Sequence, residues 1–379
     1  MQGMIPTLLF ALAAGVVALS VGYTLIAGAS LGRWMREPRR ATTDPLPPVT
    51  LLRPVKSGVP RLREHLDSLA HAARSGDQLV IGVDADSETA RLCEDWRATF
   101  PDRDIAIVQC AREAALNPKI SKLVQMTPHA RHAHWIVSDS EALLDAKFLD
   151  AFRSEWAASK VDALTSGYRF VNLDTWPQHL DAAATLLTLW PGLAIVRRFG
   201  RVRFTLGACT AFRRDDIAAV GGWSAFGEDL AEDNRIGSAL AKAGRAVRLS
   251  ANIVTLAGDP MSWRDYWRHQ RRVAVTYRVA NPAGFAGSIV TQGIVWSVLA
   301  LWMSPSAGAM LFVSVWALRW AMVRVAARVI AFPIRNLAMI VLIASLVETA
   351  CWLLAWTSPG VWWAGKWWRV FRDGKLALG

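Results

Sequence analysis

Long apolar segments lie at both ends of the chain, and shorter apolar runs alternate with amphipathic stretches between them. Ile5–Leu31 is almost uninterrupted apolar sequence, longer than the ~20 residues that a helix needs to cross the hydrocarbon core of a bilayer. Apolar stretches return at Ile289–Met303, Ala307–Val323 and Leu337–Trp356, with a tight turn expected at Ser304–Ser306. The pattern predicts membrane helices on either side of a folded domain.

The central region has the alternation that is typical of βαβ units and a parallel sheet. Strands are predicted at Val49–Leu52, Gln78–Val83, Ile105–Val108, His134–Ser138 and Ala163–Ser166. Two later strands, Arg203–Thr210 and Arg245–Leu249, are predicted to pair with each other. Helices are predicted at Pro60–Ala73, Ser87–Thr99 and Ala146–Ala158. We therefore predict one α/β domain. The predicted organisation is an anchor at 1–32, a basic and proline-containing linker at 33–48, the α/β domain at 49–281, and membrane helices with a basic, Trp-rich tail at 282–379.

A further apolar segment, Ala182–Val196, lies inside the α/β region and is interrupted by Pro191 and Gly192. Because proline and glycine break helices, we expect the segment to be too short to span a membrane. An interfacial helix and a buried core helix both fit this pattern.

Basic residues decide the predicted orientation. The cluster Arg33–Arg40 follows the first apolar segment, whereas a cleavable signal peptide begins with its basic residues. The positive-inside rule then places the N-terminus outside and the α/β domain in the cytoplasm. With three C-terminal spans, Lys366 and Arg369 would lie outside, against the same rule. Either one span is miscounted or the tail lies on the membrane surface.

Composition agrees with a membrane-bound domain. Hydrophobic residues make up 53% of the 379 residues, charged residues make up 20%, and the net charge is +12. Such a charge suits nucleic acid, an anionic bilayer or phosphate-bearing substrates, but much of it flanks apolar stretches, as at Arg319, Arg324 and Arg328. We therefore expect no nucleic-acid partner. The 4 cysteines have no metal-type spacing, so neither a zinc site nor a disulfide framework is indicated.

Acidic residues follow two of the predicted strands. Asp84 and Asp86 come after the Gln78–Val83 strand, and Asp139 and Glu141 come after His134–Ser138. Open α/β sheets bind ligands at the carboxyl ends of their strands. Asp139 and Glu141 can reach one hard cation, Mg²⁺ or Mn²⁺, and Asp84 with Asp86 can hold the base or ribose of a nucleotide.

An acidic residue and a basic run later in the chain could act together with these carboxylates. Asp233 is a candidate general base for an attacking hydroxyl, and Arg271 and Arg272 supply positive charge for a departing diphosphate. Each feature has an ordinary structural explanation as well, since acidic pairs cap helices and basic runs line membrane surfaces. The order of these residues and their membrane context favour the functional interpretation.

Seven segments carry a family resemblance: Leu52–Lys56, Val83–Asp86, Asn117–Leu123, Val137–Glu141, Leu206–Arg214, Leu230–Asp233 and Trp267–Arg272. In these segments the chain resembles the ceramide glucosyltransferase family, a group of inverting, metal-dependent glycosyltransferases that includes bacterial transferases associated with hopanoid lipids. The resemblance implies the GT-A fold, which is Rossmann-like. It covers essentially the whole α/β domain and the flanking anchor.

The resemblance also assigns roles. It implies that Asp84 and Asp86 bind the nucleotide, that Asp139 and Glu141 contact the metal and diphosphate, and that Asp233 is the catalytic base. Lys119 would approach the nucleotide, and His269 with Arg272 would belong to the family's basic motif before the membrane.

Together these features predict a multi-pass protein of the bacterial inner membrane that transfers a hexose from a UDP-sugar to the hydroxyl of a ceramide-like lipid, with inversion, at the cytoplasmic face. A hopanoid or a polyprenyl phosphate is an alternative acceptor for the same chemistry. The alternative of another class is a non-catalytic, membrane-anchored nucleotide-sugar-binding or scaffold protein.

Overall fold

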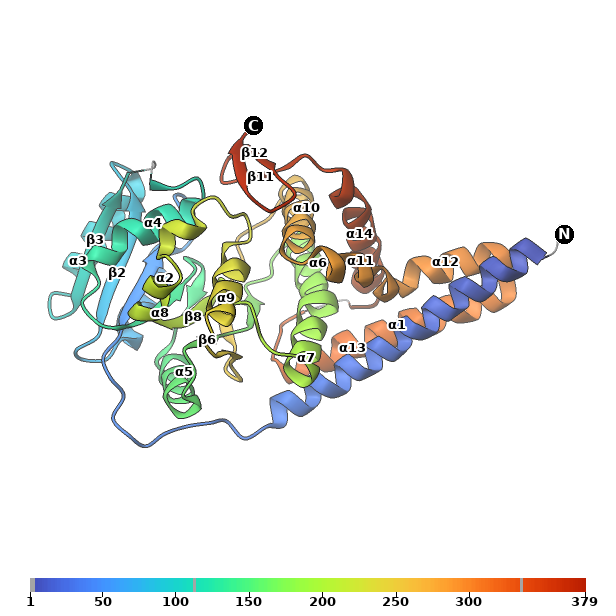
Figure 1. Cartoon of the computed structure of the whole chain (residues 1–379), viewed down its shortest axis with the longest axis horizontal. Coiled ribbons are helices and arrows are strands. Elements are labelled where there is room, and N and C mark those ends of the chain that lie inside the picture. Colours follow the sequence, from blue (N-terminus) through green and yellow to red (C-terminus); the bar gives the residue numbers. More distant parts are fainter. Residues whose placement is uncertain (1–3, 112–113, 335–336) are drawn as a thin grey trace. The chain divides into compact units, whose positions relative to one another are not determined.

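The structure is a computed structural model that describes residues 4–111, 114–334 and 337–379. The other positions, which fall within the predicted anchor, α/β domain and C-terminal region, lie outside the described residues. The chain forms two compact units, each assembled from segments that are distant in the sequence (Figure 1). The helical unit comprises Met1–Glu37, Leu173–Gly200 and Pro260–Trp367, and the α/β unit comprises Pro38–Asn172, Arg201–Asp259 and Trp368–Gly379.

A seven-stranded sheet forms the centre of the α/β unit, with the strand order β3-β2-β1-β4-β8-β6-β9. The strands β1 to β4 are parallel to one another, as predicted. The exception is β8, which runs antiparallel to both β4 and β6. The predicted pairing of Arg203–Thr210 with Arg245–Leu249 was wrong, because β9 pairs with β6, to which it is parallel. The bounds are β1 Thr50–Pro54, β2 Gln78–Asp84, β3 Asp104–Cys110, β4 His134–Ser138, β6 Ala163–Thr165, β8 Cys209–Arg213 and β9 Val247–Leu249.

Helices cover both faces of this sheet, which explains why its strands are nearly continuous apolar runs. Leu51 faces a cluster that includes residues of α2, α3 and α5, whereas the next residue, Leu52, faces residues of α4, α8 and α9. A smaller sheet, in the order β5-β10-β7, lies in the same unit. The bounds are α2 Leu62–Ala72, α3 Glu88–Ala98, α4 Pro118–Met126, α5 Ala146–Ser159, α8 Arg214–Ala219, α9 Glu232–Lys242, β5 Ala142–Leu143, β7 Tyr168–Val171 and β10 Val254–Ala257.

The predicted strand Arg203–Thr210 was wrong over most of its length, because β8 begins only at Cys209. The preceding residues satisfy their backbone donors elsewhere. The Thr205 amide donates to the Asp233 carbonyl over 3.3 Å, and the Leu206 amide donates to Thr165 Oγ1 over 2.8 Å. A side-chain acceptor and a helix carbonyl thus replace a strand partner, and the segment becomes a loop.

The helical unit contains most of the apolar sequence. Within the described residues, four helices are long and apolar enough to cross a membrane: Thr7–Arg36, Trp176–Phe199, Pro305–Val329 and Ala338–Thr357. The pair Pro282–Thr291 and Gly293–Met303, bent by 48°, adds a fifth if it forms one span. The bounds are α1 Met4–Arg36, α6 Trp176–Ala184, α7 Trp190–Phe199, α10 Trp263–Ala280, α11 Pro282–Gly287, α12 Gly293–Met303, α13 Pro305–Val329 and α14 Leu337–Thr357.

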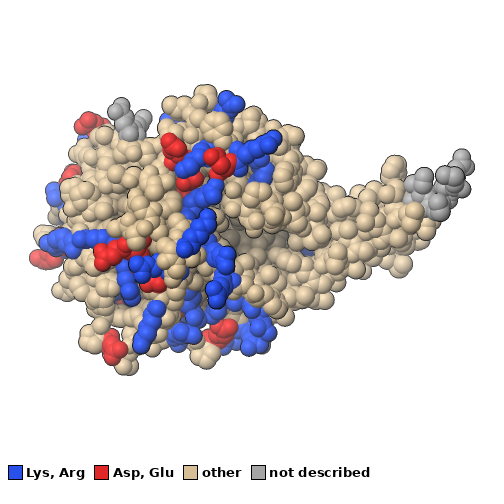
Figure 2. All heavy atoms as spheres, viewed as in Figure 1, with Lys and Arg blue, Asp and Glu red and all other residues tan. Residues whose placement is uncertain are grey.

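Helix α1 packs along both α12 and α13 (Figure 1). On the face drawn in Figure 2, the described surface of this bundle is largely free of charged side chains towards the beginning of α1, whereas Lys and Arg gather elsewhere. Such a distribution is typical of helices that contact lipid. The turn predicted around Ser304 is present, because α12 ends at Met303 and α13 begins at Pro305.

A buried polar cluster stabilises the bend before α12. Arg319 donates to the Thr291 carbonyl over 2.6 Å and lies 3.4 Å from a Glu348 carboxylate oxygen. Gln292 donates to the other Glu348 oxygen over 3.0 Å, and Thr349 donates to Gln292 over 2.8 Å. A carbonyl exposed by a broken helix needs such a partner in an apolar setting, which gives these polar residues a structural role.

The apolar segment around Pro191 is one continuous helical stretch from Trp176 to Phe199, so the expected interruption was wrong. Five residues of π-helix, Thr185–Leu189, connect α6 to α7. Proline is tolerated in the first turn of a helix, where its missing N–H is not needed, and Pro191 lies in the first turn of α7, directly after the π-helix. The changed hydrogen-bond register therefore accommodates the proline without ending the helix.

Candidate active site

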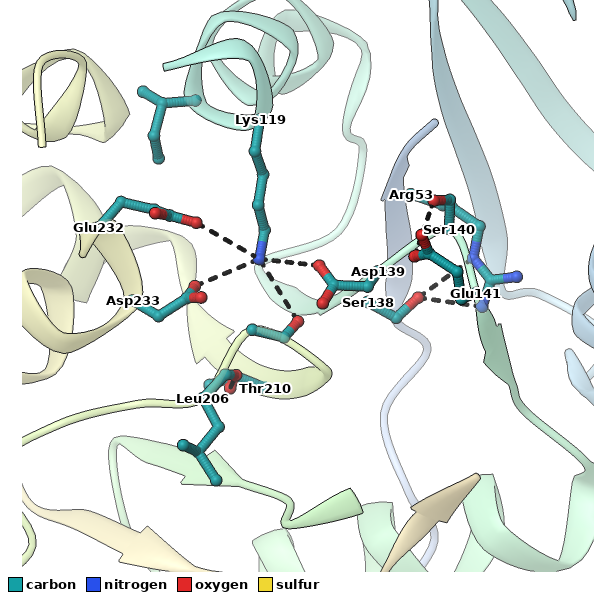
Figure 3. Close-up of polar contacts among 12 residues, drawn as sticks. Arg53, Lys119, Ser138, Asp139, Ser140, Glu141, Leu206, Thr210, Glu232 and Asp233 are labelled. Carbon is teal, nitrogen blue, oxygen red and sulfur yellow. Dashed lines mark hydrogen bonds and ion pairs between the residues drawn. The ribbon is translucent and has the colours of Figure 1, made fainter. Parts of the chain in front are cut away.

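The site is organised around Lys119, in the first turn of α4 (Figure 3). The preceding Asn117 begins this helix: its Oδ1 accepts from the amides of Lys119 and Ile120 at 2.9 and 3.1 Å. Pro118 occupies the first helical turn, where its fixed φ favours helix formation. Asn117 is fully buried, so the start of α4, and with it the base of the Lys119 side chain, is held firmly.

Three carboxylates surround the Lys119 ammonium group. Its Nζ lies 2.9 Å from Asp139, 3.2 Å from Asp233 and 3.8 Å from Glu232, and it also donates to the Gly207 carbonyl over 3.4 Å. Asp139 directly follows β4, and Glu232 and Asp233 form the start of α9. The side chains converge on Lys119 from separate elements (Figure 3). The fold therefore brings together Asp139 and Asp233, two of the acidic residues that were predicted to belong to the site.

The loop before β8 must approach these charged groups closely. A Cβ atom on Gly207 would collide with Asp233 Oδ2, and it would lie 2.9 Å from Lys119 Nζ and 3.3 Å from Asp139 Oδ2. A larger residue at this position would therefore push the ends of these three charged side chains away from their present positions. Thr210 holds the loop by donating to the Leu206 carbonyl over 2.7 Å, and Thr205 Oγ1 donates to the Asp233 carbonyl over 2.6 Å.

Burial and charge set the protonation states of the cluster. Burial by itself would lower the pKa of Lys119, but Asp139, Asp233 and Glu232 outweigh it and hold the pKa well above its usual value. Burial, and then the neighbouring Asp233, raise the pKa of Glu232 to about 8. Glu232 is also buried and accepts from Asn117 Nδ2 at 3.1 Å, whereas the Asp233 side chain is 30% exposed. Asp233 is therefore the more accessible carboxylate of the pair.

Glu141, predicted to share a cation with Asp139, turns towards a different lysine. It forms an ion pair with Lys56 and accepts from Ser140 Oγ at 2.9 Å. Lys56 also lies 3.3 Å from Asp259. Two alternate residues of a strand would face the same side, but the chain turns immediately after β4, with the Ala142 amide donating to the Asp139 carbonyl over 3.1 Å. Figure 3 shows Asp139 directed towards Lys119 and Glu141 directed away from it.

Residues that fit a metal ion are therefore few. Within the described ranges, no group of three or more His, Cys, Asp or Glu side chains has the arrangement of a metal cage. Asp139 is 35% exposed, and Mg²⁺ is commonly held by one or two carboxylates together with substrate phosphates. The donor set thus fits a cation that binds with a diphosphate at Asp139.

Asp84 contacts a second lysine of α4, Lys122. Its carboxylate is 2.8 Å from Lys122 Nζ and accepts from Ser57 Oγ at 2.7 Å. Asp86 follows in the left-handed region at φ 53, is exposed, and its amide donates to Gln109. Lys119 of α4 therefore contacts Asp139, which follows β4, and Lys122 of the same helix contacts Asp84, the last residue of β2. Both groups of predicted ligand-binding carboxylates thus lie next to α4.

The predicted basic residues lie on α10, in the helical unit. His269 Nε2 is 3.4 Å from Asp181, Arg272 is hydrogen-bonded to His269 Nδ1 over 3.1 Å, and Arg271 donates to Ser358 over 3.2 Å. These contacts order the basic run within its own unit. Its role towards a diphosphate stays a prediction.

The sequence marked Glu232 with Asp233 as an acidic pair but gave Glu232 no role, and it gave no role to Gly207, Lys56 and Asp259, which also contribute to the charged clusters of the α/β unit. For Glu232 a signal existed in its position beside Asp233, and for Gly207 in the segment that carried the family resemblance. No local pattern indicated that Lys56 and Asp259 would meet Glu141.

A comparison with protein families assigns the chain as a whole. The model of glycosyl transferase family 21 matches residues 9–376. The chain belongs to this family. The match confirms the resemblance to the ceramide glucosyltransferase family and shows that the protein is a nucleotide-sugar glycosyltransferase. No curated protein sequence matches significantly.

Two solved structures to which the chain is similar are the following. The mannosyltransferase PcManGT from Pyrobaculum calidifontis, in complex with GDP-Man and Mn²⁺, matches with a TM-score of 0.56 and 18% identity, over 92% of this chain and 98% of that chain. S. aureus TarS 1–349 in complex with UDP-GlcNAc matches with a TM-score of 0.40 and 14% identity, over 88% of this chain and 99% of that chain. The first of these confirms the predicted GT-A fold.

Proposed function

We propose that the protein transfers a hexose from a UDP-sugar to the hydroxyl group of a ceramide-like membrane lipid, with inversion at the anomeric carbon. The observation that carries this proposal is the convergence of Asp139 and Asp233 on Lys119 beside Gly207. One carboxylate near the donor's diphosphate and another near the acceptor hydroxyl are what a direct displacement needs.

The chemistry assigns one role to each residue. Asp233 accepts the proton of the acceptor hydroxyl, whose oxygen then forms a bond to the anomeric carbon. The bond from that carbon to the diphosphate oxygen breaks, and the nucleoside diphosphate leaves. Asp139 would hold a divalent cation that neutralises charge on the diphosphate. Lys119, protonated because of its three carboxylates, contributes fixed positive charge at the same place.

The test is Asp233→Asn, with Lys147→Met on the exposed surface of α5 as the matched control. We expect the Asn variant to lose transfer by about 10³-fold, within the range for removal of a general base, and to bind UDP with unchanged affinity. Full transfer by Asp233→Asn would exclude it as the base. Mass spectrometry of the lipid product distinguishes ceramide from hopanoid or polyprenyl-phosphate acceptors, and no turnover by the wild type would favour a binding protein.

Connectivity within the α/β unit supports a membrane topology for this proposal. Segments before and after Trp176–Phe199 belong to the same α/β unit. If that unit lies on one side of the membrane, the helix between them cannot make a single crossing to the other side. The tail Trp368–Gly379 also belongs to that unit. An even number of crossings between residues 260 and 367 follows, and the tail then lies on the cytoplasmic side with the α/β unit, in agreement with the positive-inside rule.

A reporter protein fused after Gly379 tests this topology, with a second fusion in the 38–48 linker as the reference. We expect both reporters to read as cytoplasmic. A C-terminal reporter on the opposite side would require an odd number of crossings and would contradict the proposal.

A further inference from the structure

The C-terminal tail contacts the segment that leads into the catalytic pair. Strands β12 (Lys366–Val370) and β13 (Leu376–Leu378) form an antiparallel hairpin, and the turn and start of β13 lie against residues 228–230. The Leu376 amide donates to the Glu228 carbonyl over 2.7 Å, and the Leu230 amide donates to the Gly374 carbonyl over 3.0 Å. These two hydrogen bonds bracket an antiparallel bridge between Asp229 and Lys375.

A buried carboxylate strengthens this contact. The Asp229 side chain is 5% exposed and lies 3.3 Å from Lys375 Nζ and 3.6 Å from Arg235 Nε. Arg235 also donates to the Asp373 carbonyl. The ion pair of Lys375 with Asp229 therefore links the tail to the 228–230 segment, and the hydrogen bond from Arg235 to Asp373 links it to α9. A buried carboxylate that loses one such partner is poorly compensated, so Lys375 matters more than an exposed lysine would.

The same segment is tied to the catalytic cluster on its other side. The Asp229 carbonyl accepts from Asn117 Nδ2 at 2.8 Å, and the same Nδ2 contacts Glu232 at 3.1 Å. The Asn117 amide donates to the Gly227 carbonyl over 2.7 Å. Residues 227–232 are thus held between Asn117, which begins the helix of Lys119, and the tail.

Helix α9 depends on these neighbours for its orientation. Its N-cap residue, Ala231, provides no side-chain hydrogen bond to the first turn, where a Ser, Thr, Asp or Asn usually stabilises the helix start. The first turn contains Glu232 and Asp233. The segment that precedes the helix therefore contributes to the position of the Asp233 carboxylate, together with the contacts from Thr205 and Lys119.

We propose that the C-terminal hairpin is a positioning element of the catalytic site, in which Lys375 holds Asp229 and thereby fixes the start of α9 and the Asp233 carboxylate. This inference rests on the function proposed above. Lys375 touches neither substrate nor reacting atoms, so its effect is on the geometry of the base. Loss of this contact changes the rate of the chemical step and leaves donor binding at Asp139 and Asp84 intact.

Lys375→Met in the full-length protein tests the proposal, with Lys375→Arg as the charge-conserving variant and Arg372→Met, at an exposed position of the same turn, as the matched control. We expect kcat to fall about tenfold for Lys375→Met, since small misplacements of catalytic groups have large effects on rate. The donor KM, measured well below the unfolding temperature, should stay unchanged, whereas the thermal unfolding midpoint should fall because the buried Asp229 loses a partner. Lys375→Arg should recover most of the rate, and Arg372→Met should match the wild type.

Hydrogen exchange supplies a readout that does not need turnover. Amides of residues 228–235 should exchange faster in Lys375→Met than in Arg372→Met, with the rest of the sheet unchanged. An unaltered kcat would overturn the proposal, and so would a loss of kcat accompanied by equally faster exchange across the whole sheet. If the wild type transfers no sugar but the exchange difference is present, the proposed function fails and the tail contact stands.

Discussion

Two lysine-centred clusters lie on either side of the short segment from Asp139 to Glu141, and they differ in burial and in composition. Lys119 is 15% exposed and contacts three carboxylates, Asp139, Asp233 and Glu232. Lys56 is 57% exposed and contacts two, Glu141 and Asp259. The first cluster has excess negative charge around one buried ammonium group, whereas the second is an ion-pair network at the surface.

This difference shows how a single turn separates two neighbouring carboxylates. Asp139 and Glu141 are two residues apart, yet the turn after β4 directs them to different lysines. Asp139 reaches a place where a helix start, a glycine loop and the first turn of α9 converge. Glu141 reaches the edge of the smaller sheet, where its carbonyl accepts from the Ala257 amide of β10 at 2.9 Å. A buried negative charge is costly unless it is paired with a positive charge. Because the first cluster has more carboxylates than cations, it is the better suited of the two to bind a cation or accept a proton.

Neutralising Asp139 and Glu141 in turn should separate the two clusters most clearly. We expect Asp139→Asn to lower sugar transfer by about 10³-fold, because it removes an electrostatic contribution to the leaving diphosphate. Glu141→Gln should lower it by less than about tenfold, as expected for a partly exposed ion pair. Initial rates with a UDP-sugar and lipid acceptor measure both. Equal losses would mean that both carboxylates serve the same ligand.

The glycine loop belongs to the first cluster alone. We expect Gly207→Ala to lower kcat by about 100-fold, because the added methyl group displaces Asp233, Lys119 and Asp139 from their positions. Gly192→Ala, where a Cβ meets nothing within 4 Å, is the control. A fully active Gly207→Ala would show that the three charged groups tolerate rearrangement.

The second cluster should be far less sensitive. Lys56→Gln removes the ion pairs with Glu141 and Asp259, and we expect it to change transfer by less than about fivefold and stability by about 1 kcal/mol or less, as for exposed ion pairs. Steady-state kinetics and thermal unfolding measure the two effects. If Lys56→Gln were as damaging as Lys119→Gln, the second cluster would have to be part of the active site.

The smallest expected effect concerns the buried Glu232. Its pKa is raised to about 8 by burial and then by Asp233, so ionising it in the folded protein is unfavourable, and stability falls as the pH rises from the unfolded value towards 8. Glu232→Gln removes this penalty. We expect its unfolding midpoint, relative to the wild type, to be higher at pH 8 than at pH 5. An identical difference at both values would contradict the raised pKa.

Much of the α/β unit could be predicted because its central strands are buried on both faces. Strand β4 was predicted with its observed bounds, and β2 differed by one residue, since continuous apolar runs have one stable environment. Short strands such as β5 and β7, and the helix α4, were not predicted. Their sequences are brief or amphipathic, and their structure depends on neighbours supplied by distant parts of the chain.

The apolar helices, the α/β order and the family could be predicted from the sequence, because these depend on periodicity and on motifs that are local in the chain. The sequence also marked Asp139 and Asp233. Tertiary contacts were needed to show that Asp139 meets Lys119 while Glu141 meets Lys56, that Gly207 lies against three charged side chains, and that the C-terminal tail reaches Asp229. These outcomes depend on turn geometry and on contacts between segments up to 146 residues apart, which no local pattern encodes.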